Sequence, residues 1–123
     1  SVKSAAAPYD LTLSTTKGDH PNISTSSFAP DFTVNRYWTI AGSSITGTYD
    51  ATFKFPRGDI DIGAVPVNFQ VQRYVDSTWY TTNLGTHDGT STQATGLTAV
   101  GDFAIGEPKP KVKNSFIYLR ENY

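Results

Sequence analysis

Residues 67–80 read VNFQVQRYVDSTWY, and this stretch decides the fold class. Apolar and polar side chains alternate, with Val67, Phe69 and Val71 on one side and Gln70 and Gln72 on the other. A period of two places alternate residues on opposite faces of a strand. Asp76 and Ser77 favour a tight turn, so residues 78–80 return as the second strand of a hairpin. The stretch therefore predicts antiparallel β structure with one buried face.

The same alternation recurs along the chain at the spacing typical of β-sandwiches. Further strands are predicted at residues 9–15, 34–40, 48–55, 92–97 and 102–106, with a polar crossing loop at 20–30 and a turn at 87–89. Their expected inward side chains are Val34, Trp38, Ile40, Ala51, Phe53, Phe55, Phe103 and Ile105. We expect an all-β, immunoglobulin-like antiparallel β-sandwich of roughly seven to eight strands.

Composition and charge exclude several classes of function. Aromatic residues make up 13% of the chain, and together with Thr and Val they suit a pleated sheet. The net charge of -1 creates no field that would attract nucleic acid or an anionic membrane. No run approaches the roughly 18 apolar residues of a membrane span, so membrane insertion is not expected. The chain contains neither Cys nor Met, which predicts a core without disulfides and a piece processed from a longer precursor.

The composition changes after Glu107. Residues 108–114 combine two prolines with three lysines, which favours an extended linker. Residues 115–123 then contain a strand-like run formed by Phe116, Ile117, Tyr118 and Leu119. Such a strand needs a partner, either its own sheet or an exposed edge of a neighbouring copy. We therefore predict a β-sandwich module over residues 1–107, a Lys/Pro-rich linker over 108–114 and a C-terminal assembly strand within 115–123.

Several separate blocks of sequence are typical of a known repeat when they occur in this order. They are VNRYWTI at 34–40, YDATF at 49–53, GDIDIGA at 58–64, QRY at 72–74, STW at 77–79, ATGLT at 94–98 and GDFAIGE at 101–107. Together they resemble a β-sandwich repeat of large secreted and cell-surface, adhesin-like proteins of the Bacteroidota. The resemblance spans residues 17–107. It implies export to the cell surface or the medium, and it brings no established catalytic residues.

The histidines are the first candidates for catalysis. His20 and His87 are the only two in the chain, and each stands beside an aspartate in a predicted loop or turn. Hydrolysis needs a nucleophile or paired carboxylates held beside such a base. Neither a nucleophile elbow nor metal-ligand spacing accompanies these residues. We interpret both as turn caps and predict that the protein is not an enzyme and has no cofactor.

Two short acidic motifs invite a binding interpretation. Asp59 and Asp61 offer the oxygen ligands that Ca²⁺ prefers, and a bound ion there would be structural. The alternative is that they belong to a turn and a strand end. Arg57-Gly58-Asp59 spells the tripeptide that integrins recognise, which we interpret as coincidence because Gly58-Asp59 already belongs to the turn.

Two modification motifs lie in predicted loops. Asp76-Ser77-Thr78 matches a short O-glycosylation signal resembling that of exported Bacteroidota proteins, with Ser77 as the acceptor. Asn22-Ile23-Ser24 matches the eukaryotic N-glycosylation pattern, which the implied bacterial source would leave unused.

Exposed aromatic side chains provide the last candidate site. Tyr37, Tyr74, Trp79 and Tyr80 would suit stacking on sugars if they formed an exposed row. The alternative is that they pack in the core or pair across strands. The sequence thus predicts a non-enzymatic, extracellular structural or adhesion module, with carbohydrate binding as the alternative. Its expected partners are other domains or copies of the same surface protein, or extracellular glycans.

Overall fold

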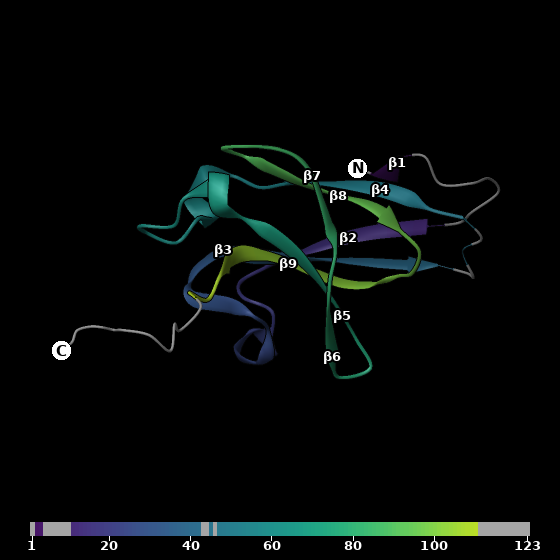
Figure 1. Cartoon of the computed structure of the whole chain (residues 1–123), viewed down its shortest axis with the longest axis horizontal. Helices are drawn as coiled ribbons and strands as arrows, with labels where there is room; N and C mark the ends of the chain where they lie inside the picture. Colours follow the sequence, from purple (N-terminus) through teal and green to yellow (C-terminus); the bar gives the residue numbers. More distant parts are fainter. Residues whose placement is uncertain (1, 4–10, 43–44, 46, 111–123) are drawn as a thin grey trace, which may run out of the picture.

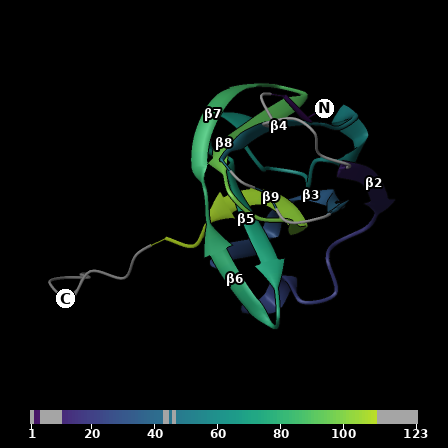
Figure 2. The same cartoon turned by 90° about the vertical axis from the view of Figure 1, so that its right-hand side faces the viewer.

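The computed structural model describes residues 2–3, 11–42, 45 and 47–110. Its strands form two antiparallel sheets that pack face to face (Figure 1, Figure 2). The four-stranded sheet contains, in spatial order, β1 (Val2–Lys3), β4 (Tyr49–Lys54), β8 (Ser91–Leu97) and β7 (Asn83–Asp88). The five-stranded sheet contains β2 (Leu11–Lys17), β3 (Phe28–Gly42), β9 (Gly101–Pro108), β5 (Gln70–Val75) and β6 (Thr78–Thr81).

The predicted all-β antiparallel sandwich is confirmed. The short helical turns of the described residues are the 3-10 turns η1 (Ile23–Thr25), η2 (Arg57–Asp59) and η3 (Pro66–Asn68). Eight strands remain when the two-residue β1 is set aside, as the sequence predicted. The described part of the chain has no helix that is long and apolar enough to cross a membrane.

Aromatic side chains from both sheets meet in the core. Trp38 on β3 lies opposite Phe103 on β9, so both rings point to the same inner face. Phe53 on β4 of the other sheet stacks on Phe103 with ring centroids 5.2 Å apart, and its centroid lies 5.1 Å from that of Trp38. All eight side chains predicted to point inward are buried. Each large apolar side chain contributes roughly 1.5–3 kcal/mol when fully buried.

The predicted start of the strand at residues 67–74 was wrong. Pro66 has a fixed φ that suits a tight turn, and it begins η3. The strand therefore starts at Gln70, and Val67 is 64% exposed. Gln72 was also placed wrongly, because it is buried on what should be the solvent face. The cause is that residues 18–27 cover this face of the five-stranded sheet, where Gln72 Nε2 donates to Ser27 Oγ.

Two other stretches differ from the sequence prediction. The expected polar loop at 20–30 ends early, because β3 begins at Phe28, whose side chain is fully buried. Residues 83–88 form strand β7, where the sequence predicted only a turn at 87–89, and the turn itself lies at Gly89 and Thr90. None of the β7 side chains is buried, so this edge strand lacks the apolar alternation that predicts strands.

The last strand continues beyond Glu107. Pro108 lies opposite Phe28 on β3, and the Lys109 backbone N–H donates to Ser27 O at 2.8 Å. These contacts attach the first two residues of the predicted linker to the sheet. The rest of that linker beyond Pro110, and the predicted assembly strand with Phe116, Ile117, Tyr118 and Leu119, lie outside the described residues.

The hairpin of the opening stretch is confirmed. Tyr74 pairs with Trp79 and Val75 with Thr78, which leaves Asp76 and Ser77 as the two turn residues. Their φ angles are 50° and 62°. Two consecutive positive φ values are what a type I′ turn requires, and its right-handed twist matches the flanking strands.

This turn yields a stability prediction. Ser77→Gly should raise the free energy of unfolding by about 0.5–1 kcal/mol, because glycine adopts positive φ without the steric cost that Ser pays. Urea denaturation measures this change. Thr78→Gly, one residue further and inside β6, is the control and should lower stability. A loss of stability in Ser77→Gly as large as in the control would contradict the turn geometry.

Candidate functional site

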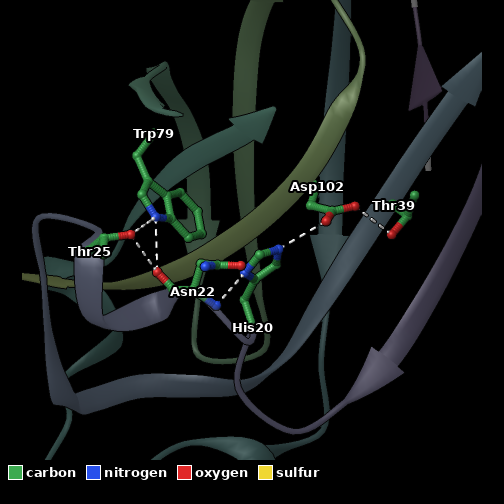
Figure 3. A network of polar contacts seen from close by, with 6 residues as sticks. All are labelled: His20, Asn22, Thr25, Thr39, Trp79 and Asp102. Carbon is green, nitrogen blue, oxygen red and sulfur yellow. Dashed lines mark hydrogen bonds and ion pairs between the residues drawn. The ribbon is translucent and has the colours of Figure 1, made fainter. Parts of the chain in front are cut away.

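The outer face of the five-stranded sheet carries three of the four aromatic candidates, Tyr37, Tyr74 and Trp79. Thr39 on β3 and Tyr74 on β5 both lie opposite Asp102 on β9, and Tyr74 lies opposite Trp79 on β6. Residues directly opposite each other on neighbouring strands point to the same face. The loop before β3 crosses this face and places His20 among these side chains (Figure 3).

His20 is buried and hydrogen-bonded through both ring nitrogens. The Asn22 backbone N–H donates to Nδ1 at 3.0 Å, and Nε2 lies 2.9 Å from Asp102 Oδ2 (Figure 3). A backbone N–H can only donate, so Nδ1 is the acceptor and Nε2 carries the proton that is donated to Asp102. The other carboxylate oxygen, Oδ1, accepts a hydrogen bond from Thr39 Oγ1 at 2.8 Å. The tautomer of His20 is therefore fixed by its neighbours.

Three aromatic rings surround the imidazole. The centroids of Tyr37, Tyr74 and Trp79 lie 4.9, 4.7 and 5.1 Å from that of His20, all in edge or tilted orientations. Such orientations are favoured because the positive edge of one ring meets the negative face of another. We call these residues, with His20 and Asp102, the His20 cluster. It holds together one loop and four strands, β3, β5, β6 and β9.

Trp79 attaches the same loop at a second point. Its Nε1–H lies 3.0 Å from both Asn22 O and Thr25 Oγ1 (Figure 3). The indole therefore uses its only donor within the molecule. Three of the four aromatic candidates for sugar stacking thus meet around His20 and do not form an exposed row.

The His20 cluster resembles a catalytic dyad in composition and differs from one in its geometry. A general base needs a nitrogen that faces the substrate, whereas both nitrogens of His20 are occupied and its ring is buried. The interpretation of His20 as a simple turn cap was incomplete. Its main partner is Asp102, 82 residues away, and not the adjacent Asp19. No local sequence signal reports a contact at this separation.

The cluster yields a second stability prediction. His20→Ala should lower the free energy of unfolding by roughly 2–4 kcal/mol, because it removes the packing of three rings and leaves Asp102 Oδ2 without its donor. Chemical denaturation measures the loss. His87→Ala is the matched control, since His87 is exposed on β7 and should change stability little. Equal effects of the two substitutions would contradict a structural role for the cluster.

The Ca²⁺ candidates have partners within the protein. Asp59 is buried, and its Oδ2 accepts a hydrogen bond from Arg36 Nε at 2.7 Å. Asp61 Oδ2 accepts from the Thr33 backbone N–H at 2.9 Å, and Oδ1 accepts from Asn35 Nδ2 at 2.7 Å. These contacts tie η2 and the segment after it to β3. Within the described ranges, no group of three His, Cys, Asp or Glu side chains is placed to hold a metal ion.

Because Asp59 is buried, the integrin-like tripeptide does not expose its carboxylate at the surface. Its residues form η2, and the carboxylate faces Arg36 of the same chain. An integrin ligand must present this carboxylate to its partner, so the geometry agrees with the interpretation that the tripeptide occurs here by coincidence.

Ser77, the predicted O-glycosylation acceptor, is exposed at the tip of the β5–β6 hairpin.

Asp19, beside Asp61, has a perturbed acidity. Burial raises the pKa of Asp19 above its ordinary value of 3.8, the hydrogen bond from Thr33 lowers it, and the negative charge of Asp61 raises it. Because the pKa of Asp19 is higher in the folded state than in the unfolded chain, ionised Asp19 lowers the free energy of unfolding. This loss of stability is complete near pH 7, and it disappears as the pH falls through the raised pKa towards 3.8.

This perturbation predicts a pH-dependent effect. Asp19→Asn should stabilise the fold at pH 7, because the amide oxygen still accepts from Thr33 without carrying a charge. The gain should vanish near pH 3, where Asp19 itself is neutral. Urea denaturation at both pH values measures it. Asp31→Asn is the control, since the exposed Asp31 lines the same shallow depression. An equal gain for both variants, or a gain that persists at low pH, would contradict this explanation.

Tyr80 lies on the opposite side of β6 from Trp79, because consecutive side chains of a strand alternate. It is 45% exposed, and the Arg73 guanidinium lies over its ring, 4.7 Å from the centroid. Arg73 Nη1 also donates to Val100 O at 2.9 Å.

The charge of Arg73 also acts on Tyr49. Burial raises the pKa of Tyr49 to about 12, and the positive charge of Arg73 opposes this rise. The Tyr49 hydroxyl donates to Ala99 O.

A groove opens between the two sheets at the β2 edge. Its lining residues are Leu13, Ser14, Thr15, Trp38, Thr52 and Lys54. Leu13 lies opposite the buried Ile40, so it points to the inner side of the sheet, yet it is 39% exposed. The reason is that the facing sheet has only the two-residue β1 beyond β4 in the described part. We call this feature the β2 groove.

No family model matches the chain, and no curated protein or solved structure matches it either. The resemblance to the surface-protein repeat therefore stays a prediction from the sequence blocks.

Proposed function

We propose that this chain is a non-enzymatic structural or adhesion module of a secreted or bacterial cell-surface protein. The observation that carries the proposal is the double hydrogen bonding of His20, which turns the best acid–base candidate into part of the fold. Asp59 and Asp61 are bonded within the protein in the same way. The polar groups that chemistry would need are used to attach loops to the sandwich.

The β2 groove supports assembly as the means of attachment. β2 is a seven-residue edge strand, and among the described residues it pairs only with β3. Exposed edges of this kind accept an added strand, whose backbone bonds give affinity and whose alternate side chains fill pockets. The groove offers the half-exposed Leu13 to such side chains, and the buried Trp38 lies beneath it. The predicted strand with Phe116, Ile117, Tyr118 and Leu119, supplied by a second copy, is the segment we propose to occupy it.

Truncation tests this mechanism. A chain that ends at Pro110 keeps every described contact of β9, so it should retain its thermal midpoint and lose self-association. Sedimentation velocity over a range of concentrations measures the association. Leu13→Lys in the full chain should have the same effect, because a charge would enter the apolar part of the groove. Full-length chains that remain monomeric, or truncated chains that still associate, would overturn assembly through this strand.

The position of the truncation determines whether the fold keeps its last contacts with β3 and Ser27. A chain that ends at Glu107 also loses the pairing of Pro108 with Phe28 and the hydrogen bond from Lys109 to Ser27. It should unfold more easily, so a loss of assembly in that chain could come from the fold. A useful surface control is Leu84→Lys, since Leu84 on β7 is 43% exposed and lies outside the β2 groove.

Carbohydrate binding is the second candidate. The gathering of Tyr37, Tyr74 and Trp79 around His20 does not favour it, because these rings contact each other. One observation does favour it, namely the exposed ring of Tyr80 beside Arg73.

A further inference from the structure

We propose that Arg73 and Tyr80 form a binding site for a sugar that carries a carboxylate, such as a hexuronic acid. This inference rests on the proposed adhesion function, because it names the class of ligand to which the module would attach. The site is independent of the β2 groove. In the five-stranded sheet β6 and β2 are opposite edges, so the two features lie on opposite open sides of the sandwich.

A polar cleft lined by Arg73 forms one part of the proposed site, and Tyr80 adjoins it through the contact of its ring with the Arg73 guanidinium. The cleft lies where β5 and the segment after β6 approach β7 and the end of β8, and its lining includes Arg73, Thr81, Asn83, Thr95 and Thr98. Among the described residues, no acidic side chain is part of this lining, although Asp50 Oδ1 accepts from the backbone N–H of Gly96, one of the lining residues. The cleft therefore has the charge and the hydrogen-bonding groups that suit a polar anion.

The charge of Arg73 points to a carboxylate. Arg73 is half-buried, and the ion pairs of the described residues are His20–Asp102 and Arg36–Asp59. Its guanidinium thus lies in the cleft without an acidic partner from this part of the chain. A partly buried cation is stabilised by a counter-ion, and a guanidinium suits a carboxylate because two of its N–H groups can bond both oxygens. Within the described residues, only one of its N–H groups has an acceptor, the Nη1 donor to Val100 O.

The neighbouring groups point to a sugar as the body that carries this carboxylate. The Arg73 guanidinium lies over one face of the Tyr80 ring, and Tyr80 is still 45% exposed, which leaves the remaining ring area for the apolar face of a pyranose. The side chains of Thr81, Asn83, Thr95 and Thr98 form no hydrogen bond with any other residue the structure describes, which leaves them for sugar hydroxyls. An inorganic anion could accept from the arginine and from these hydroxyl and amide donors, but it has no apolar face to place on the Tyr80 ring.

The experiment titrates the full-length chain with glucuronate, glucose and acetate while amide chemical shifts are recorded by NMR. Glucuronate should bind with a dissociation constant of about 1 mM, as expected for a ligand of this size. Glucose lacks the carboxylate and acetate lacks the ring, so each should bind at least about tenfold more weakly. The largest shifts should come from Arg73, Tyr80 and Asn83.

Matched variants assign the binding to these side chains. Arg73→Gln and Tyr80→Ala should each weaken glucuronate binding by about tenfold or more. Tyr80→Phe keeps the ring, and Arg57→Gln removes an exposed arginine near the β7–β8 turn, so both should bind like the parent chain. Arg73→Gln also loses the bond to Val100. If it fails to fold, Tyr80→Ala and Asn83→Ala decide the question, since both side chains are exposed.

Several outcomes would overturn the site. Equal affinity for glucuronate and glucose would remove the role of the carboxylate, and equal affinity for glucuronate and acetate would reduce the site to anion binding. Retained binding in Tyr80→Ala, or an equal loss in Arg57→Gln, would place the ligand elsewhere. Leu13→Lys separates this inference from the assembly mechanism, because it should abolish self-association and leave glucuronate binding intact.

Discussion

The contact of Phe53 with Phe103 and Trp38 joins the two sheets, and the rest of the molecule is arranged around it. These rings come from β4 of one sheet and from β9 and β3 of the other, so the stack exists only when both sheets are formed. In the described part of the chain, large side chains fill the inner faces of the two sheets where these rings meet. The candidate sites considered above lie on the outer face and at the edges of the sheets.

Side chains on the outer face of the five-stranded sheet also stabilise the fold, because they bind the loop of residues 18–27. The loop of residues 18–27 is polar, and a polar loop stays on a sheet only when its donors and acceptors are matched. His20, Asn22 and Trp79 supply that matching, with Asp102 as the acceptor from below. A histidine and an aspartate in contact often indicate catalysis. Here the same pair is satisfied on every side, and its effect is to fix a loop.

The two open sides of the sandwich differ in chemistry, which supports two separate roles. At the β2 side the groove presents Leu13 above the buried Trp38, with Lys54 as the one charged residue of its described lining, which suits the side chains of an added strand. At the β6–β7 side the cleft presents Arg73 among hydroxyl and amide groups, which suits a hydrated, charged ligand. A module that is joined to its own kind on one side and holds a glycan on the other would serve attachment without any chemical turnover.

The sequence by itself determined the strands that have one buried face and the hairpin between β5 and β6. Alternation around Trp38, Phe53 and Phe103, and the turn at Asp76-Ser77, are local signals, because side-chain period and turn chemistry act over a few residues. Edge strand β7 escaped prediction because none of its side chains is buried, and the cover over Gln72 escaped because a distant loop provides it. Only the tertiary structure decided that His20 meets Asp102, that Tyr37, Tyr74 and Trp79 converge on His20, and that the Arg73 guanidinium lies over the Tyr80 ring beside a polar cleft. These contacts depend on which strands become neighbours, and that order is set by the packing of the whole chain and not by any one segment of it.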